Sequence, residues 1–206
     1  VDAKLAISKD YFTIKKKKWI TNISSRKRAH LIRSEYNAII STSKSINADN
    51  SKLNCRLNGF NHSKPDLIII DIKMKLKKNL SLFKIKKRKI IIITCNIKYK
   101  KLSFFKKKNI KIIYIRSLKT KKDFSNLLLL LNKHQYQRIL VESGLTFLNT
   151  LLKNKLISNL YLFKSTDILG KKGKNNASIN TLKKIKLKNK IKVNLYGENL
   201  YKIKIK

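Results

Sequence analysis

Short, uninterrupted apolar runs recur along the chain and predict most of its strands. Such runs occupy residues 38–40, 67–70, 90–94, 110–115 and 139–141. Runs of this length without polar alternation are typical of strands buried on both faces of a parallel sheet. A looser alternation predicts a first strand within residues 2–8, and residues 159–164 predict another. Residues 181–206 alternate around a Gly197-Glu198 turn, which predicts an antiparallel hairpin.

Helical spacing appears between several of these strands. Ala29, Ile32 and Tyr36 fall on one face of a helix that Ser24 or Ser25 caps. Helices are also predicted from the cap residue at 123 to residue 134, and from 147 to 156. Strands and helices therefore alternate, and the sequence predicts a single α/β domain over residues 1–206. Its sheet is expected to be mixed and mostly parallel, flanked by helices, with a C-terminal antiparallel hairpin.

Three further segments are interpreted as irregular. Residues 10–18 form a Lys-rich connection, and residues 73–89 indicate a loop with a poor edge strand. Residues 41–45 are rich in hydroxyl groups, which either satisfy phosphate oxygens or simply fill a loop. Trp19 is the only tryptophan, and a lone tryptophan is more often a core residue than a ligand platform.

The composition adds a formal net charge of +41, which is typical of proteins that bind nucleic acid. However, only 7 of the 51 basic residues are arginine, and the lysines are spread over the whole length. Lys, Ile and Asn have A/T-rich codons, so a genome drifting toward A/T would produce the same bias. We therefore expect the charge mainly to concentrate phosphorylated ligands near the surface, and we do not expect nucleic acid as the partner.

The spacing of the two cysteines, Cys55 and Cys95, matches neither a metal-binding motif nor a disulfide framework. We therefore expect that the protein binds no metal and that it resides in a reducing, cytoplasmic environment. No run of about 18 uncharged apolar residues is present, so no membrane span is expected. The chain starts without methionine inside a strand pattern, which suggests that it was cut from a longer chain.

The densest candidate chemistry lies at residues 138–151. Glu142 follows a predicted strand, Gly144 lets a ligand approach the backbone, and Thr146 opens a helix. A strand end that meets a helix start is where open α/β sheets bind ligands and where phosphate is favoured. The alternative is a capped helix with a surface glutamate. Arg26, His30 and Arg33 are spaced four and three residues apart, so they share one face of the first helix. That face either holds an anion or is merely solvated.

Taken in order, these blocks resemble the reductase domain of the bacterial bifunctional riboflavin-biosynthesis deaminase/reductase, which has a dihydrofolate-reductase-like fold. The matching blocks are KLAISKD at 4–10, WIT at 19–21, HLIR at 30–33, NAIISTSKSINADNSKLNCR at 37–56, IIID at 68–71, ILVESGLTFLNTLL at 139–152, LISNLYLF at 156–163 and ILG at 168–170.

The resemblance implies reduction of the ribosyl group of 5-amino-6-(5-phosphoribosylamino)uracil to a ribityl group, with NADPH as cofactor. It implies cofactor contacts at Ala6, Trp19, Ser45, Asp49, Gly144, Leu145, Thr146, Phe147, Leu148, Asn149 and Thr150. It implies substrate contacts at Lys17, Arg33, Leu53, Arg56 and Glu142. Two arginines would grip the ribose phosphate, and the turn and helix start would hold the cofactor pyrophosphate. Opening of the sugar ring needs a proton donor or a charge partner, for which Glu142 and Lys4 are the candidates.

The chain also departs from that family. Tyr11 stands where the family usually has glycine, Lys17 replaces a serine, Ser45 replaces a threonine, Asn50-Ser51 replaces an Asp-Pro-like pair, and Leu145 replaces a proline. The resemblance also implies a homodimer and an upstream zinc deaminase domain that this chain lacks. Two alternatives stay open: a basic RNA- or ribosome-associated binding protein, and a reductase of the same fold that acts on another pterin or pyrimidine.

Overall fold

The computed structural model describes residues 1–15, 19–60, 64–97, 99–178, 182 and 185–206. Lys17, one of the expected substrate contacts, lies outside the described residues. The chain forms two compact units, one of residues 1–32 with 145–206 and one of residues 33–144. One boundary falls within helix α1 (Ile23–Ser34), and the other falls directly before helix α5 (Leu145–Lys153).

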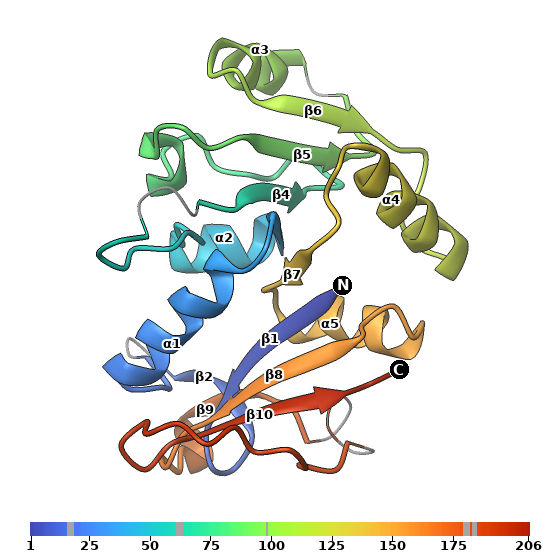
Figure 1. Ribbon diagram of the computed structural model, residues 1–206. Coiled ribbons are helices and arrows are strands. Elements are labelled where there is room, and N and C mark those ends of the chain that lie inside the picture. The colour runs from blue at the N-terminus through green and yellow to red at the C-terminus, as the bar shows by residue number, and fades with distance from the viewer. Residues whose placement is uncertain (16–18, 61–63, 98, 179–181, 183–184) are drawn as a thin grey trace. The chain divides into compact units, whose positions relative to one another are not determined.

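The unit of residues 33–144 is built on five parallel strands in the order β7-β3-β4-β5-β6 (Figure 1). The strands are β3 (Ala38–Thr42), β4 (Asp66–Ile70), β5 (Ile90–Thr94), β6 (Lys111–Tyr114) and β7 (Ile139–Val141). The isoleucine-rich runs are buried in β4 and β5, as the absence of alternation predicts. β6 is more exposed, because it pairs with a neighbour on one side only among the described strands.

The helices of this unit correct two interpretations. Residues 43–49 form helix α2 (Ser43–Asp49) rather than loop filler, and the Thr42 hydroxyl caps it by accepting from the Ser45 amide. Residues 73–89, all of which the structure describes, contain the 3₁₀ helix η1 (Ser81–Lys84) and not the expected edge strand. Helix α3 (Tyr99–Lys107) lies in a Lys-rich stretch whose sequence predicted no element.

Helix α4 (Lys121–Lys133) begins with a capping box. Thr120 is the cap residue, and its hydroxyl accepts from the Asp123 amide at 3.2 Å, so the expectation that Asp123 itself caps the helix is wrong. The Asp123 carboxylate accepts from the Ser117 hydroxyl at 2.5 Å and from the Lys119 and Thr120 amides at 2.9 and 3.0 Å. These hydrogen bonds, the one from Ser117 first, hold the pKa of Asp123 far below its usual range. His134 ends the helix, as predicted.

Asp123 therefore makes the stability of the chain depend on pH. We expect Asp123→Asn to lower the midpoint of thermal unfolding at pH 7, because the amide accepts these hydrogen bonds less strongly than the carboxylate does. An aspartate in an unfolded chain has a pKa of about 3.9. The stabilisation of the folded state by the Asp123 carboxylate is therefore complete above that pH. It disappears as the pH falls through the lowered pKa of Asp123 in the folded state. Melting curves of both proteins between pH 7 and pH 2 should converge toward the acid end. A gap of constant size over that range would contradict this account.

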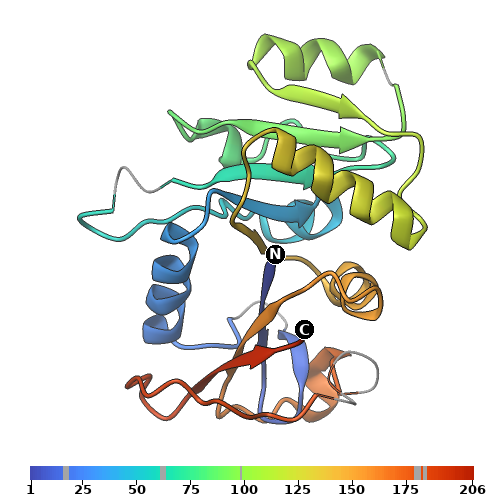
Figure 2. The same ribbon diagram turned by 45° about the vertical axis from the view of Figure 1, so that its right-hand side comes forward.

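The unit of residues 1–32 with 145–206 contains three strands in the order β10-β8-β1, which lie side by side in both views (Figures 1 and 2). β1 (Asp2–Ile7) pairs parallel with β8 (Asn159–Lys164), and β10 (Asn199–Lys204) pairs antiparallel with β8. The mixed sheet with an antiparallel C-terminal strand confirms the predicted fold class. In the part of the expected first arm that the structure describes, the hairpin is reduced to a single antiparallel bridge between Lys190 and Tyr201.

Two short strands in this unit were not predicted from the sequence. β2 (Phe12–Lys15) lies in the predicted Lys-rich connection and pairs antiparallel with β9 (Gly173–Asn176). Gly173 is required there, because a Cβ atom would overlap the ring of Phe12. The cap of helix α1 is Asn22, whose side-chain oxygen accepts from the Ser25 amide at 2.9 Å, and not Ser24 or Ser25.

Trp19 is not a core residue, because 68% of its surface is exposed. The guanidinium of Arg26 lies over the indole ring, 5.4 Å from its centroid, and Arg26 also donates to the Thr21 carbonyl at 2.9 Å. The tryptophan is thus held in place by a cation–π contact at the surface. Among the described helices, none is both long and apolar enough to cross a lipid bilayer.

Candidate functional site

An ion pair between Arg33 and Glu142 is the centre of the candidate site. Glu142 directly follows β7, and its amide donates to the Ile40 carbonyl of β3 at 2.9 Å, which fixes the backbone. The guanidinium binds the carboxylate with two parallel hydrogen bonds, from Nε to Oε1 at 2.5 Å and from Nη2 to Oε2 at 2.9 Å. The side chains are only 13% and 8% exposed. Burial lowers the pKa of Arg33, but the charge and hydrogen bonds of Glu142 outweigh it and raise the pKa overall.

Asn54 connects this pair to a second guanidinium. The Asn54 carbonyl oxygen accepts from Nη1 of Arg33 at 3.3 Å, and its side-chain oxygen accepts from Nη1 of Arg56 at 3.0 Å. Asn54 is buried, whereas Arg56 is exposed. Partial burial and the charge of Arg33 lower the pKa of Arg56. The structure therefore brings Arg33, Arg56 and Glu142 together, with Arg56 as the solvent-facing cation.

The loop that carries Asn54 is fixed by a residue that sequence reasoning missed. Arg88 donates to the carbonyl oxygens of Lys52, Leu53 and Pro65 at 2.5, 2.5 and 2.9 Å. Leu53, an expected substrate contact, is buried and has a positive φ of 48°. No local signal marks Arg88 in the sequence, because its partners lie 23 to 36 residues away.

The expected cofactor residues Ser45 and Gly144 are in contact. The Gly144 amide donates to the Ser45 hydroxyl oxygen at 3.0 Å, and the Thr42 hydroxyl donates to the same oxygen at 3.0 Å. Gly144 is exposed, and a Cβ there would lie 3.4 Å from that oxygen, at ordinary van der Waals distance. Asp49, another expected contact, is exposed at the end of α2.

Asp71, at the carboxyl end of β4, is a further polar residue that was not predicted. Its carboxylate is buried and accepts from the Ser43 hydroxyl at 2.7 Å and from the Lys75 and Leu76 amides at 2.8 Å each. The sequence feature that could have identified Asp71 is its position directly after an apolar run. Ser41 is also buried, and its hydroxyl has no hydrogen-bond partner within the part of the chain that the structure describes. The carboxyl ends of β3, β4 and β7 thus share a polar edge.

The remaining expected residues lie in the other unit. Ala6 and Lys4 are half-buried in β1, and the Lys4 ammonium lies 5.6 Å from the Phe163 ring centroid. Leu145 to Thr150 form the first turns of α5, where the Thr150 hydroxyl donates to the Thr146 carbonyl at 3.0 Å. Leu148 is buried in the core. The side-chain oxygen of Asn149 is buried and has no partner among the described residues.

A parallel sheet with a charged and hydroxyl-rich carboxyl edge defines an α/β protein of the kind that binds small polar ligands at that edge. The chain belongs to the family described as the RibD C-terminal domain, whose model matches residues 2–199.

Similar proteins include a riboflavin biosynthesis protein RibD of Actinobacillus pleuropneumoniae. It is 25% identical over 191 residues, which cover 89% of this chain and 50% of that protein. The solved structure of Acinetobacter baumannii RibD in its second form has a TM-score of 0.78 at 19% identity, covering 98% of this chain and 56% of that one. The Saccharomyces cerevisiae riboflavin biosynthesis reductase Rib7 has a TM-score of 0.73 at 21% identity, covering 98% and 88%.

These similarities confirm the reductase-domain resemblance and the expected fold. The chain spans about half the length of the curated relatives that it matches.

Proposed function

We propose that this chain is an NADPH-dependent reductase that converts the ribosyl group of 5-amino-6-(5-phosphoribosylamino)uracil to a ribityl group. The observation that carries the proposal is the cluster of Arg33, Glu142 and Arg56 at the carboxyl end of β7 in a chain of this family. Similar proteins named for riboflavin biosynthesis support it. The homodimer and the deaminase domain stay predictions.

The two arginines of this cluster have different roles in substrate binding. Both Nε and Nη2 of Arg33 are engaged by Glu142, so Arg33 chiefly orients the carboxylate. Arg56 is exposed and carries a positive charge toward solvent, so it is the principal group for the ribose phosphate. Glu142 then faces the sugar or the uracil as an oriented hydrogen-bond acceptor. This assignment refines the expectation that both arginines grip the phosphate.

Each unit, taken by itself, carries groups that fit the chemistry of part of a dinucleotide. Ser45 and Gly144 combine a hydroxyl with a position that has no Cβ, and the first amides of α5 lack acceptors within the helix. The buried, unpartnered oxygen of Asn149 is an acceptor that suits a ligand N–H or O–H. The exposed Trp19 ring offers a stacking surface. When bound, the reduced nicotinamide supplies the hydride.

The protein therefore contributes orientation and proton handling. Glu142, held by Arg33 in one geometry, is proposed to take up the proton of the glycosylic N–H and to return a proton to the ring oxygen, so that the ribose ring opens to the imine that the hydride reduces. Lys4, at the middle of β1, is the alternative donor of the proton to the ring oxygen. A same-fold reductase acting on another pyrimidine or pterin would use the same cofactor groups, but it would not need Arg56 for a phosphate.

Fluorescence and absorbance together test the proposal. NADPH added to the purified chain is expected to change nicotinamide fluorescence in a saturable way, and adding the phosphoribosylaminouracil should then consume NADPH. Saturable binding without turnover would favour another pyrimidine or pterin. Absence of NADPH binding, with salt-sensitive RNA binding instead, would reject the reductase in favour of the RNA-associated alternative.

A further inference from the structure

The side chain of Arg88 holds the backbone that leads into the candidate site. Its guanidinium donates from Nη1 to the Lys52 carbonyl and from Nη2 to the Leu53 carbonyl, at 2.5 Å each. Its Nε donates to the Pro65 carbonyl at 2.9 Å. One planar group therefore joins two segments of the chain. A guanidinium offers donors in several fixed directions, whereas a lysine ammonium acts as a compact point charge.

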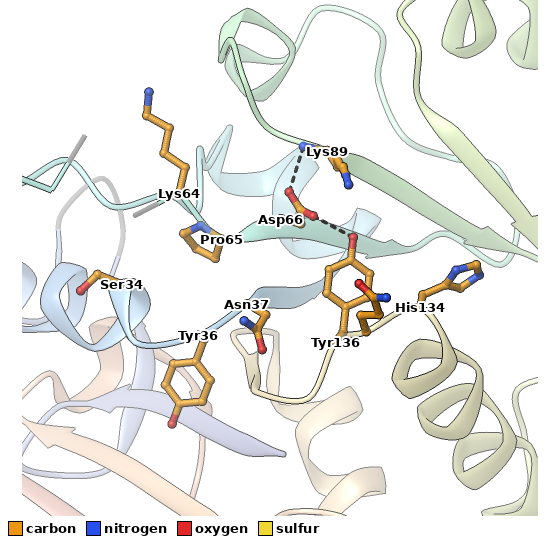
Figure 3. Close-up of a pocket in the computed structure, with 10 residues that line it drawn as sticks. Ser34, Tyr36, Asn37, Lys64, Pro65, Asp66, Lys89, His134 and Tyr136 are labelled. Atoms are coloured by element: carbon orange, nitrogen blue, oxygen red, sulfur yellow. Dashed lines mark hydrogen bonds between the residues drawn. The ribbon is translucent and has the colours of Figure 1, made fainter. Parts of the chain in front are cut away.

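The bond to Pro65 anchors Arg88 to the sheet. Pro65 directly precedes Asp66, which is the first residue of β4. The Asp66 carboxylate accepts from the Tyr136 hydroxyl at 2.7 Å and from the Lys89 amide at 3.0 Å, and Figure 3 shows it between these two groups. Burial lowers the pKa of Arg88 to about 10, although the charge of Asp66 opposes this, so Arg88 is positively charged at neutral pH. Arg88 is thus fixed at the amino end of β4.

The backbone that Arg88 holds is strained. Leu53 has a positive φ of 48°, in the left-handed region that is unfavourable for a residue with a Cβ atom. Such a conformation persists only where the surrounding structure enforces it. Here the leucine side chain is buried, and its carbonyl oxygen accepts the hydrogen bond from Nη2 of Arg88. Loss of that bond would let the backbone at Leu53 relax toward a negative φ.

The conformation of Leu53 sets the direction of Asn54, the next residue. Asn54 is buried, and its two oxygen atoms serve the two arginines of the candidate site. Its carbonyl oxygen accepts from Arg33 at 3.3 Å, and its side-chain oxygen accepts from Arg56 at 3.0 Å. A change of φ at Leu53 would turn both oxygens away from these partners. The hydrogen bond from Arg56 to Asn54 thereby orients a guanidinium that is otherwise exposed to solvent.

We propose that Arg88 is a positioning residue for the phosphorylated substrate, because it holds the backbone of residues 52–54 so that Arg56 is oriented toward the phosphate. This proposal rests on the proposed function, in which Arg56 binds the ribose phosphate. Arg88 acts through the backbone and takes no part in hydride transfer or in proton handling. Its loss should therefore raise KM for the substrate, while kcat and the dissociation constant of NADPH stay near normal.

Arg88→Lys tests this assignment, because lysine keeps the positive charge but cannot contact three carbonyl oxygens in the same geometry. KM for the phosphorylated substrate should rise about tenfold, the effect of weakening one charged hydrogen bond. The matched control is Arg138→Lys, at an exposed arginine 3.8 Å from Glu35, which should leave KM unchanged. A fall in kcat together with weaker NADPH binding would show a merely structural role and overturn the proposal.

A double variant shows whether Arg88 acts through Arg56. In the Arg56→Ala chain, Arg88→Lys should raise KM no further, because the group that it positions is already absent. An equal rise of KM in both backgrounds would contradict the proposal. Unchanged KM in the single variant of an active chain would overturn this proposal alone. A wild-type chain without turnover would instead overturn the proposed function, and this proposal with it.

Hydrogen exchange gives a readout that needs no turnover. Arg88→Lys should accelerate amide exchange in peptides that cover residues 52–56, because this backbone loses its restraint. Exchange in α4, which makes no contact with Arg88 through the hydrogen bonds described above, should stay unchanged. Unchanged exchange at residues 52–56 would overturn the proposal. Faster exchange throughout residues 33–144 would show general loss of folding stability and would overturn it as well.

Discussion

Glu142→Gln is expected to lower kcat at least about 100-fold, the lower range for a group that handles a proton. The dissociation constant of NADPH, measured by fluorescence, should change little. Glutamine keeps the shape of Glu142 but cannot balance the charge of Arg33, and it cannot take up a proton. The matched control is Glu35→Gln, which neutralises an acid in an exposed pair whose atoms lie 3.8 Å apart. It should leave turnover near normal, because exposed ion pairs contribute little.

The same substitution removes one partner of a largely buried ion pair, so stability must be measured with it. Urea unfolding should show a loss of up to about 3 kcal/mol, because an uncompensated charge stays in the interior. The double variant Arg33→Met with Glu142→Leu removes both charges and should recover most of that stability without recovering turnover. Recovery of turnover in the double variant would show that the pair is only structural. Unchanged kcat in Glu142→Gln would remove Glu142 from proton handling.

Arg56→Ala is expected to raise KM for the phosphorylated substrate about 10- to 100-fold, the effect of losing a charged hydrogen bond of about 1.5–3 kcal/mol. Because Arg56 is exposed, the unfolding free energy should stay near normal. Arg116→Ala, at another exposed arginine, is the control for net charge and should leave KM unchanged.

The dephosphorylated substrate makes the Arg56 test specific. It should bind weakly to the wild-type chain, and Arg56→Ala should not weaken it further, because the interaction that the arginine provides is already absent. An equal loss for both substrates would contradict phosphate binding by Arg56 and would indicate a role in shaping the 50–56 loop.

The strands that carry the candidate site were predictable, because an isoleucine run buried on both faces leaves little alternative to a central strand. Helix α2 was not, because Ser, Asn and Asp compete for the backbone hydrogen bonds of a helix and resemble a loop. β2 and β9 have four residues each and stabilise one another across more than 150 positions, so neither carries a local signal.

The candidate site likewise contains residues that could be identified from the sequence and residues that could not. Glu142 was identifiable because an acid between a buried strand and a glycine turn is a local pattern. Its partner was not, because the bond to Arg33 joins residues 109 positions apart. The family resemblance assigned Arg33 to a phosphate, whereas in the folded chain two of its nitrogens are engaged with Glu142. Arg88 and Asp71 act through backbone groups, whose positions only the folded chain defines.

Isotope transfer tests the central claim most directly. The chain would be incubated with phosphoribosylaminouracil and NADPH deuterated at the transferable position of the nicotinamide. The proposed function predicts a ribityl product that carries one deuterium at the former anomeric carbon, detected by mass spectrometry and NMR. Unconsumed substrate, or a ribityl product without deuterium, would contradict the assignment of this chain as the reductase.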